Sequence, residues 1–508
     1  MPDSSARYGF FPSDWSARQA ASASRDFGEL KVGAQGLFWV EFNPQDGRNT
    51  LWRWHGQQAQ CLTPPHLSLR SRVHEYGGGV FCLTEQGVAF VNDSDQQLYE
   101  QRLGDGRVRR LGDASLCRYG DLQFDPLAQA LIAVEECHGQ GRVRNRLVSV
   151  ALVDGHRRVL AEGADFYSSP VLSDDGQRLA WIEWDRPAQP WTHTRLCAAR
   201  RDSRGQWPLL QVMAGSDGEE SLQQPRFTAA GDLLCLSDRD GWWQPWGEVP
   251  GHWQRLPHAH DSDHGSAPWQ LGACSYLPLD DGGLLLSRLV NGWGQLLVQD
   301  AAGAEQRLAA GYSRFRALAV DGDFFYCIAA APERLSAILA ISRRDGGVQI
   351  LAGGEQPLAA KQLAMPQTLE YASGGEHAYG FFYAPPQRSA LAEQPPLVVF
   401  LHGGPTSACY PVFDPRIQFW TQRGFAVADL NYRGSSGFGR AYRQRLEGQW
   451  GVIEVEDAVA VVAHLAADGR IDPARAFIRG GSAGGYTALC ALAFHTVFRV
   501  CYSFFGVI

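Results

Sequence analysis

The sequence predicts a β-propeller of seven blades followed by a C-terminal α/β domain, and three observations support this prediction. Between about residues 30 and 365, short apolar or aromatic runs are broken by Gly, Asp, Asn and Pro, which is typical of short strands and turns. A phrase made of a turn and an alternating strand recurs along this stretch. After residue 366, apolar strand patterns alternate with helical ones, which indicates a mostly parallel sheet with both faces covered.

The repeated phrase is clearest in the segments 168–184 and 222–240, which share a proline, a turn ending in glycine and an alternating strand. Weaker copies extend the series, and in chain order the seven turns lie near Gly36, Gly87, Ala128, Gly176, Gly231, Gly283 and Gly322. Successive turns are 39 to 55 residues apart, which brackets the ~40–50 residues of a four-stranded blade. We therefore expect seven blades, and a pair of β-sandwiches is the alternative.

Sequence patterns also divide the chain into three parts. Residues 12–27 predict a helix that begins at Ser13 or Asp14. Residues 452–469 predict a helix with apolar side chains on one face at 3.6-residue spacing. Strands are expected at 379–384, 397–405, 425–434 and 476–480. The predicted boundaries are an N-terminal segment 1–29, a propeller 30–365 and an α/β domain 366–508.

Composition excludes several classes of protein. Hydrophobic residues make up 45% and charged residues 20% of the 508 residues, which is typical of a globular chain and not of a disordered or collagen-like one. The formal net charge is -8 and no basic stripe is present, so we expect no nucleic-acid partner. No run approaches the ~20 apolar residues of a membrane helix, and the start lacks the pattern of a secretory leader. We expect no membrane partner, and the residues do not fix an oligomeric state.

The 11 cysteines are scattered and never form a C-x-x-C pair. This pattern favours small, buried, free thiols in the reducing cytoplasm, and it predicts no metal site.

The motif with the clearest chemical meaning is G-x-S-x-G at residues 480–485, where Ser482 is the central serine. An apolar strand pattern precedes it and a helix pattern follows it, as a nucleophile elbow requires. The small neighbours permit a sharp turn that exposes the serine at the start of a helix, whose positive end favours a developing oxyanion. The sequence therefore predicts an α/β-hydrolase domain with Ser482 as its nucleophile.

A second element, His402-Gly403-Gly404-Pro405, follows the predicted strand at 397–401. Acyl transfer needs two backbone donors that point at the oxyanion, and Ala483, directly after the nucleophile, supplies one natural candidate. Gly404 supplies the other, because glycine allows close approach and the following proline fixes the turn. A glycine-rich strand end without a chemical role is the alternative.

The acid and base that should follow the nucleophile are missing. After Asp472 the sequence has no Asp or Glu, and its last histidine, His495, lies 13 positions past Ser482 on the same helix, about 20 Å away at 1.5 Å per residue. Asp429 and His402 lie upstream and would reverse the chain order of this fold. We therefore expect that the sequence is cut short and that the 508-residue chain is inactive by itself.

Four motifs together resemble the prolyl oligopeptidase family of serine peptidases. They are RSRVHEYGGG (70–79), HGGP (402–405), NYRGSSGFG (431–439) and GGSAGGY (480–486). The first of them and the HGGP form resemble the acylaminoacyl-peptidase and dipeptidyl-aminopeptidase-like bacterial branch. This resemblance implies a propeller that caps the active site, short peptides as substrates, no cofactor, and Ser482, Gly404 and Ala483 in the roles given above. It also implies an N-terminal segment that packs on the hydrolase domain.

Three further residues are candidates for substrate binding. Glu75 is placed to bind a substrate's free amino group, unless its segment only forms the edge of a blade. Tyr432 and Arg433 leave the end of a strand and either shape the substrate pocket or fix a loop. Other functions remain open: an esterase or amidase of the same fold, or a propeller that binds a partner beside an inert hydrolase domain.

Overall fold

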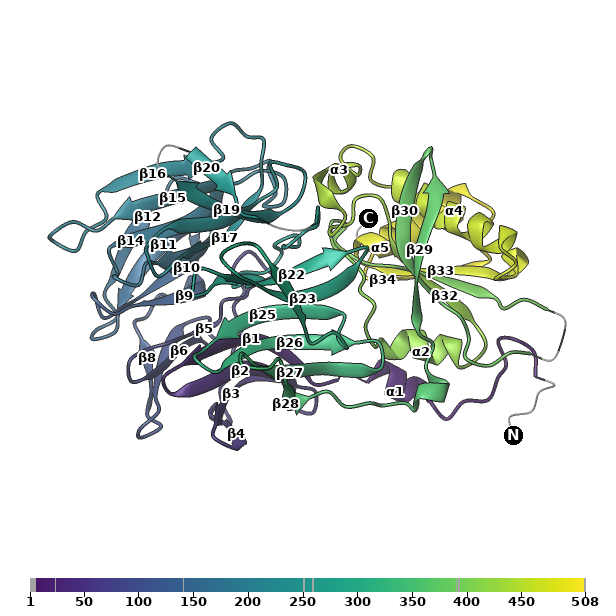
Figure 1. Ribbon diagram of the computed structural model, residues 1–508, viewed down its shortest axis with the longest axis horizontal. Coiled ribbons are helices and arrows are strands. Elements are labelled where there is room, and N and C mark those ends of the chain that lie inside the picture. Colours follow the sequence, from purple (N-terminus) through teal and green to yellow (C-terminus); the bar gives the residue numbers. More distant parts are fainter. Residues whose placement is uncertain are drawn as a thin grey trace.

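The computed structural model describes residues 6–22, 24–139, 141–249, 252–257, 260–389, 391 and 393–506. A ring of small sheets, coloured purple to teal in Figure 1, lies beside an α/β domain coloured green to yellow. Seven sheets of four strands each form the ring, and one sheet of six strands forms the centre of the second domain. Both predicted fold classes are therefore confirmed.

Each blade consists of four consecutive antiparallel strands. Blades 1 to 4 contain β1 (Asp26–Gly33), β2 (Gly36–Asn43), β3 (Arg48–His55), β4 (Gln58–Cys61), β5 (Phe81–Leu83), β6 (Gly87–Val91), β7 (Leu98–Arg102), β8 (Val108–Leu111), β9 (Cys117–Asp125), β10 (Ala130–Gly139), β11 (Arg142–Ala151), β12 (Arg157–Ala161), β13 (Phe166–Leu172), β14 (Arg178–Trp184), β15 (Arg195–Arg200) and β16 (Leu209–Ala214). Blades 5 to 7 contain β17 (Leu222–Phe227), β18 (Leu233–Ser237), β19 (Gln244–Val249), β20 (His252–Arg255), β21 (Tyr276–Pro278), β22 (Leu284–Val290), β23 (Trp293–Gln299), β24 (Glu305–Leu308), β25 (Arg314–Val320), β26 (Phe324–Ala331), β27 (Arg334–Ser342) and β28 (Val348–Gly353).

All seven repeated turns lie at the hairpin between the first and second strand of a blade, or on the first residue of the second strand. The repeat therefore marked one structural position in every blade. The first strand starts at Asp26, so the boundary placed between residues 29 and 30 falls inside β1. The first residues of β1 include few apolar side chains, so a boundary based on apolar runs is placed too late in the chain.

Apolar packing between the first and last blades closes the ring. Phe27 and Trp39 of blade 1 share a buried cluster with Ile328 and Ile338 of blade 7, and each of these four side chains is at most 1% exposed. Each blade keeps its own four strands, so side-chain packing closes the ring without a strand exchanged between blades.

Carboxylates on the inner strands also join neighbouring blades. Both side-chain oxygens of Glu29 in blade 1 accept from the amide of Val80 in blade 2, at 2.8 and 3.0 Å. Asp121 in blade 3 accepts from the amide of Ser169 in blade 4 at 2.6 Å. Burial raises the pKa of Glu29 to about 7. Such contacts between neighbouring blades add hydrogen bonds to the apolar packing of the ring.

The second domain is built on a sheet with strand order β29-β30-β32-β31-β33-β34. Its elements are η1 (Ala360–Gln362), β29 (Pro366–Ser373), β30 (Glu376–Tyr383), β31 (Leu397–Leu401), α2 (Pro415–Thr421), β32 (Ala426–Asn431), α3 (Gly439–Gln444), α4 (Ile453–Ala467), η2 (Pro473–Arg475), β33 (Ala476–Gly481), α5 (Ala483–Phe494) and β34 (Val500–Phe504). The last four strands of this order pair in parallel, as the alternating pattern predicted.

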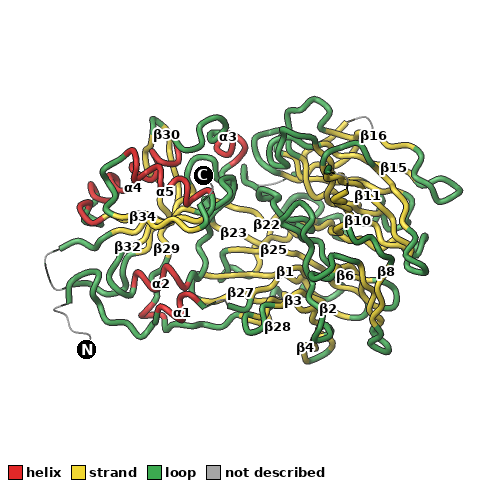
Figure 2. Tube along the Cα trace, turned by 180° about the vertical axis from the view of Figure 1, so that it is seen from behind, coloured by secondary structure: helices red, strands yellow, loops and turns green. Residues whose placement is uncertain are grey.

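Helices cover both faces of this sheet. In Figure 2, α4 and α5 lie on one side of the strands, and α2 lies on the other together with the N-terminal helix α1 (Ala17–Ala21). The final strand β34 is partly open to solvent, because Val500 is 56% and Tyr502 is 64% exposed. Val507 and Ile508 lie outside the described residues.

The N-terminal segment packs on the hydrolase domain, as the family resemblance implied. The indole N–H of Trp15 donates to the carbonyl of Pro415 at the start of α2, at 3.0 Å. The predicted helix start is wrong, because the helix begins at Ala17 with Ser16 as its N-cap, and Ser13 instead donates to Gln422 at 2.6 Å. A tertiary contact therefore occupies the side chain that the local pattern offered as a cap.

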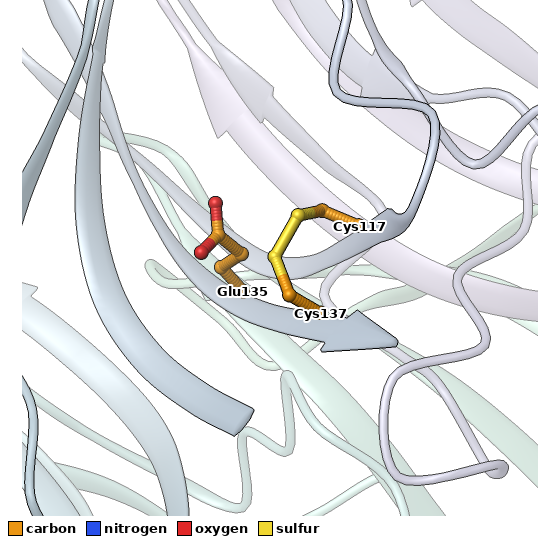
Figure 3. Close-up of side chains that lie close together, drawn as sticks. All are labelled: Cys117, Glu135 and Cys137. Carbon is orange, nitrogen blue, oxygen red and sulfur yellow. A yellow bond between two sulfur atoms is a disulfide. The ribbon is translucent and has the colours of Figure 1, made fainter. Parts of the chain in front are cut away.

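Two cysteines contradict the expectation that all of them are free. Cys117 and Cys137 are directly opposed in the β9–β10 pair and form a disulfide (Figure 3). Glu135 lies beside them, and Arg157 holds its carboxylate with two hydrogen bonds. The two sulfur atoms are bonded to each other and the carboxylate of Glu135 is paired with Arg157, so this cluster is a structural cross-link.

No helix among the described parts of the chain is long and apolar enough to cross a membrane.

Candidate active site

Ser482 lies at the sharp turn between strand β33 and helix α5. Its backbone has φ 53° and ψ −125°, a left-handed conformation that is uncommon for any residue other than glycine. Such strain persists where the surrounding structure holds it, and it is frequent at functional sites. The side chain is half-buried, so it remains open to a reactant.

Glycines on both sides make this turn possible. A Cβ at Gly480 would collide with the carbonyl of Gly484. A Cβ at Gly484 would lie 2.5 Å from the carbonyl oxygen of Leu401 and 2.6 Å from that of His402. The first turn of α5 therefore packs directly against the end of β31, which fixes Ser482 relative to the neighbouring loop.

The HGGP loop emerges beside the serine. Strand β31 pairs in parallel with β33, and Leu401 lies opposite Gly480. A Cβ at Gly403 would lie only 3.5 Å from the Cβ of Ser482. Gly404 has φ 127°, and a Cβ there would lie 2.8 Å from the amide nitrogen of Thr406, so glycine is required.

The structure thus brings three of the sequence-predicted residues together at the carboxyl edge of the sheet. Ser482 and Ala483 are adjacent in the chain. Gly404 directly follows Gly403, the glycine that lies beside the Cβ of Ser482. Ala483 is the first residue of α5, and amides in the first turn of a helix have no carbonyl partner within that helix. This arrangement can hold an anion beside the serine hydroxyl.

His402 stabilises the HGGP loop and is not placed as a base for the serine. Its Nδ1 lies 2.8 Å from the carbonyl oxygen of Gly403, and its Nε2 lies 2.8 Å from the hydroxyl of Ser435. Burial lowers the pKa of His402 to about 4, so the ring is neutral near pH 7. With hydrogen on Nδ1, that atom donates to Gly403 and Nε2 accepts from Ser435.

Among the described residues, no histidine forms a hydrogen bond with the hydroxyl of Ser482. His495 is the C-cap of α5, in the position that a helix-terminal cation would take. Asp429 lies within β32, near Arg416 and Asp414, and burial raises its pKa to about 7. The upstream residues therefore do not form an acid–base pair with the serine.

Tyr432 and Arg433 are interior residues. Tyr432 is 0% exposed and stacks on the imidazole of His402, with ring centroids 4.3 Å apart. Arg433 is 4% exposed, and its guanidinium contacts Asp457 at 2.8 Å and Glu456 at 3.1 Å. These contacts favour the loop-fixing alternative over direct binding of substrate.

Glu75 has a different environment, because it lies in the loop between β4 of blade 1 and β5 of blade 2. It borders a cavity of about 380 Å³ together with His74 and Tyr76. Arg118 of β9 donates to the carboxylate of Glu75 at 2.8 Å and to that of Glu136 at 3.2 Å. Sequence analysis missed Arg118 and Glu136, because only the β9–β10 register places them beside this turn.

A larger cavity of about 700 Å³ is lined mostly by propeller residues and reaches the hydrolase domain. Its lining includes Ser407, Tyr410 and Ser436 from the hydrolase side. Trp269 borders both cavities, and its indole N–H donates to the carbonyl of Thr406 at 2.6 Å. The propeller therefore contacts the loop that carries Gly404. Local sequence patterns do not predict this contact, because Trp269 and Thr406 lie far apart in the chain.

Known proteins of similar sequence and structure agree with this geometry. A profile of the prolyl oligopeptidase family matches residues 411–508. A puromycin-hydrolyzing peptidase of Mycobacterium tuberculosis is 32% identical, with a TM-score of 0.93, over 99% of this chain and 81% of that one. Puromycin hydrolase is 29% identical, with the same TM-score and coverage, and a variant of it has been solved as a complex with PGG.

One curated relative, the uncharacterized peptidase YuxL of Bacillus subtilis, is 27% identical over 182 residues. That match covers 35% of this chain and 28% of the relative. The chain therefore aligns with well under half of this relative's length, whereas it spans most of the puromycin-hydrolyzing peptidase. Together with the elbow at Ser482, the similarity along nearly the whole chain shows that this protein belongs to the prolyl oligopeptidase family.

Proposed function

We propose that this protein is a serine peptidase that cleaves short peptides through an acyl intermediate on Ser482. One observation carries the proposal: the strained Ser482 lies against Gly403, with Gly404 and the start of α5 beside it. A hydroxyl that faces two backbone donors is the arrangement that acyl transfer requires.

In this mechanism the oxygen of Ser482 attacks the substrate carbonyl and forms a tetrahedral oxyanion. The amides of Gly404 and Ala483 donate hydrogen bonds to that oxyanion. Its collapse breaks the amide bond, releases the amine and leaves an ester on Ser482, which water then hydrolyses. Attack needs a base that takes the serine proton and then donates it to the leaving amine. Among the described residues no histidine bonds to the hydroxyl of Ser482, so we propose that residues 1–508 alone turn over slowly or not at all.

Short peptides fit the position of the site. The propeller contacts the loop that carries Gly404 through Trp269, and the cavity of about 700 Å³ ends at Ser407, Tyr410 and Ser436 of the hydrolase domain, so we propose that small peptides reach Ser482 from this cavity. Two solved proteins of similar structure are named as a puromycin-hydrolyzing peptidase and a puromycin hydrolase, which leads us to propose aminoacyl amides and short peptides as the substrate class. Glu75, at the rim of the second cavity, is proposed to bind the free amino group of such a substrate, and Tyr432 and Arg433 to fix the loops beneath the site.

A comparison of substrates tests the proposal. The protein encoded by the complete gene should hydrolyse aminoacyl and dipeptidyl p-nitroanilides, and Ser482→Ala should abolish that activity. An esterase of the same fold would instead prefer p-nitrophenyl esters. Equal amide hydrolysis by the parent and Ser482→Ala would remove the serine from the mechanism.

A second candidate is a hydrolase domain that is inert beside a propeller that binds a partner. The same assay separates the two, because an inert domain would hydrolyse neither amides nor esters at any pH. An open reading frame beyond codon 508 that encodes an Asp and then a His would favour the enzyme.

We also propose a cytoplasmic location. Nine cysteines are free thiols, and five of them are buried, which suits a reducing compartment. The Cys117–Cys137 pair is the exception among the described cysteines.

A further inference from the structure

The cavity of about 700 Å³ has more positive than negative side chains along its described lining. Four arginines border it: Arg70, Arg288, Arg314 and Arg316. The carboxylates that border it are those of Glu29 and Asp263, and backbone amides of neighbouring segments already donate hydrogen bonds to both. The lining therefore favours an anionic ligand over a cationic one.

Arg314, on strand β25, is the half-buried arginine of this lining whose charge has no counterpart. The guanidinium of Arg288 lies 2.9 Å from the carboxylate of Glu305, and that of Arg316 lies 2.7 Å from the carboxylate of Asp26. The side chain of Arg314 forms no ion pair and no hydrogen bond with any residue that the structure describes. A cation that is partly withdrawn from water gains most from an anionic partner, so this side chain indicates an anion in the cavity.

The guanidinium of Arg314 lies at the end of the cavity that the hydrolase domain forms. Its central carbon is 4.1 Å from the ring centroid of Tyr410. Tyr410 belongs to the segment that joins β31 to α2, the same segment that begins with the HGGP loop. Contact with the face of an aromatic ring uses none of the five N–H donors of a guanidinium. These donors therefore remain available to a ligand beside the loop that carries Gly404.

A second unused donor borders the same end of the cavity. Ser436 is 1% exposed, and its hydroxyl has no hydrogen-bond partner among the described residues. The preceding residue, Ser435, bonds through its hydroxyl to the imidazole of His402 at 2.8 Å, so this segment lies against the HGGP loop. Buried polar groups in proteins are normally paired, and an unpaired hydroxyl at a cavity wall indicates a polar ligand.

We propose that Arg314 binds a carboxylate of the substrate in this cavity. A guanidinium pairs with a carboxylate through two parallel N–H donors, which gives both strength and orientation. Every short peptide with an unmodified C-terminus carries an α-carboxylate, and an Asp or Glu side chain is a second source of the same group. The assignment rests on the proposed peptidase function, because the carboxylate belongs to the substrate of Ser482.

The test uses the Ser482→Ala variant of the protein encoded by the complete gene, so that binding is measured without hydrolysis. Calorimetry compares alanine peptides of two to five residues, each with a C-terminal carboxylate or a C-terminal amide. At one length, the acid should bind about ten- to hundredfold more tightly than the amide. Amidated peptides that carry one Glu or one Gln form a second comparison, in which tighter binding of Glu would identify a side-chain carboxylate as the ligand.

The proposal is wrong if neither comparison shows a preference for the carboxylate. It is also wrong if none of these peptides binds measurably.

Variants assign the preference to Arg314. Arg314→Gln should bring the ratio of acid to amide affinity close to one, and Arg314→Lys, which keeps the charge but loses the planar fork, should retain part of it. Arg70→Gln is the matched control, because Arg70 borders the same cavity without an ion pair but is exposed to solvent, and its ratio should equal that of the parent. Each ratio compares two peptides on one preparation, so a partly unfolded sample does not change it. If Arg314→Gln is insoluble, Arg314→Lys supplies the test.

A full preference that persists in Arg314→Gln or Arg314→Lys would contradict the assignment. A preference that disappears in Arg70→Gln would also contradict it.

The two proposals can fail separately. If the parent protein hydrolyses no amide while Ser482→Ala binds carboxylates through Arg314, the carboxylate site stands and the peptidase assignment falls. If the parent hydrolyses peptides while Ser482→Ala binds acids and amides equally, the carboxylate site falls and the peptidase assignment stands.

Discussion

Asp238 of the propeller and Arg443 of helix α3 form an ion pair across the domain interface, with side chains that are 0% and 1% exposed. Arg440 also donates to the same carboxylate oxygen at 2.7 Å. Nearby, Asp263 accepts from the amides of Gly437 and Gly439 at 3.1 and 3.0 Å. Two propeller carboxylates therefore hold the loop and helix that follow β32.

Removal of one partner from this buried pair should weaken the docking of the domains. We expect Asp238→Ala to lower the free energy of unfolding by about 3–5 kcal/mol, because two guanidinium groups would lose their carboxylate. Asp113→Asn is the matched control, since its pair with Arg110 is exposed and should contribute less than about 1 kcal/mol. Urea unfolding measures both, and equal stability of the two variants would contradict a coupling role for Asp238.

Glu29 should make stability depend on pH. Burial raises its pKa from 4.5 to about 7, so the folded state holds a proton that the unfolded state releases between these values. The contribution of Glu29 is complete below pH 4.5 and is lost as the pH rises towards and through 7. We therefore compare the free energy of unfolding of the parent with that of Glu29→Gln at each pH. The parent should lose stability relative to this variant when the pH is raised from 5 to 7.5. A difference that stays constant across this range, measured by urea unfolding, would exclude the effect.

Much of the fold follows from local patterns, because a hairpin or an elbow is specified by residues close in sequence. The turns near Gly36 and Gly322 mark equivalent hairpins in the first and last blades, and the residues around Ser482 predict its strained turn. The Cys117–Cys137 cross-link and the contact between Trp269 and Thr406 depend on register and domain docking. No spacing in the sequence encodes these long-range relationships.

Gly484 should be sensitive to the smallest substitution. A methyl group there would meet the carbonyl oxygens of Leu401 and His402, which belong to backbone and cannot move without the HGGP loop. We expect Gly484→Ala to cost roughly 1–3 kcal/mol of stability and to reduce amide hydrolysis. Gly311→Ala is the control, since open space surrounds a Cβ at that position. Similar melting temperatures and activities for both variants would show that the elbow and loop are not packed as described.

The disulfide should stabilise the propeller. Cys117 and Cys137 are separated by 20 residues, and a cross-link over such a loop contributes about 3 kcal/mol by restricting the unfolded chain. Cys137→Ser should therefore lower the midpoint of guanidinium unfolding under oxidising conditions, and added dithiothreitol should shift the parent to match it. The exposed thiol Cys61 offers a control, because Cys61→Ser should leave the midpoint unchanged. A parent insensitive to reductant would contradict this role.

The central claim is that Ser482 is a reactive nucleophile that faces the backbone of the HGGP loop. Its most direct test is labelling of the protein encoded by the complete gene with a fluorophosphonate, followed by mass spectrometry of the modified peptide. The account predicts a single adduct on Ser482 that disappears in Ser482→Ala and persists in Ser503→Ala. No adduct on Ser482, or equal labelling of the parent and Ser482→Ala, would contradict it.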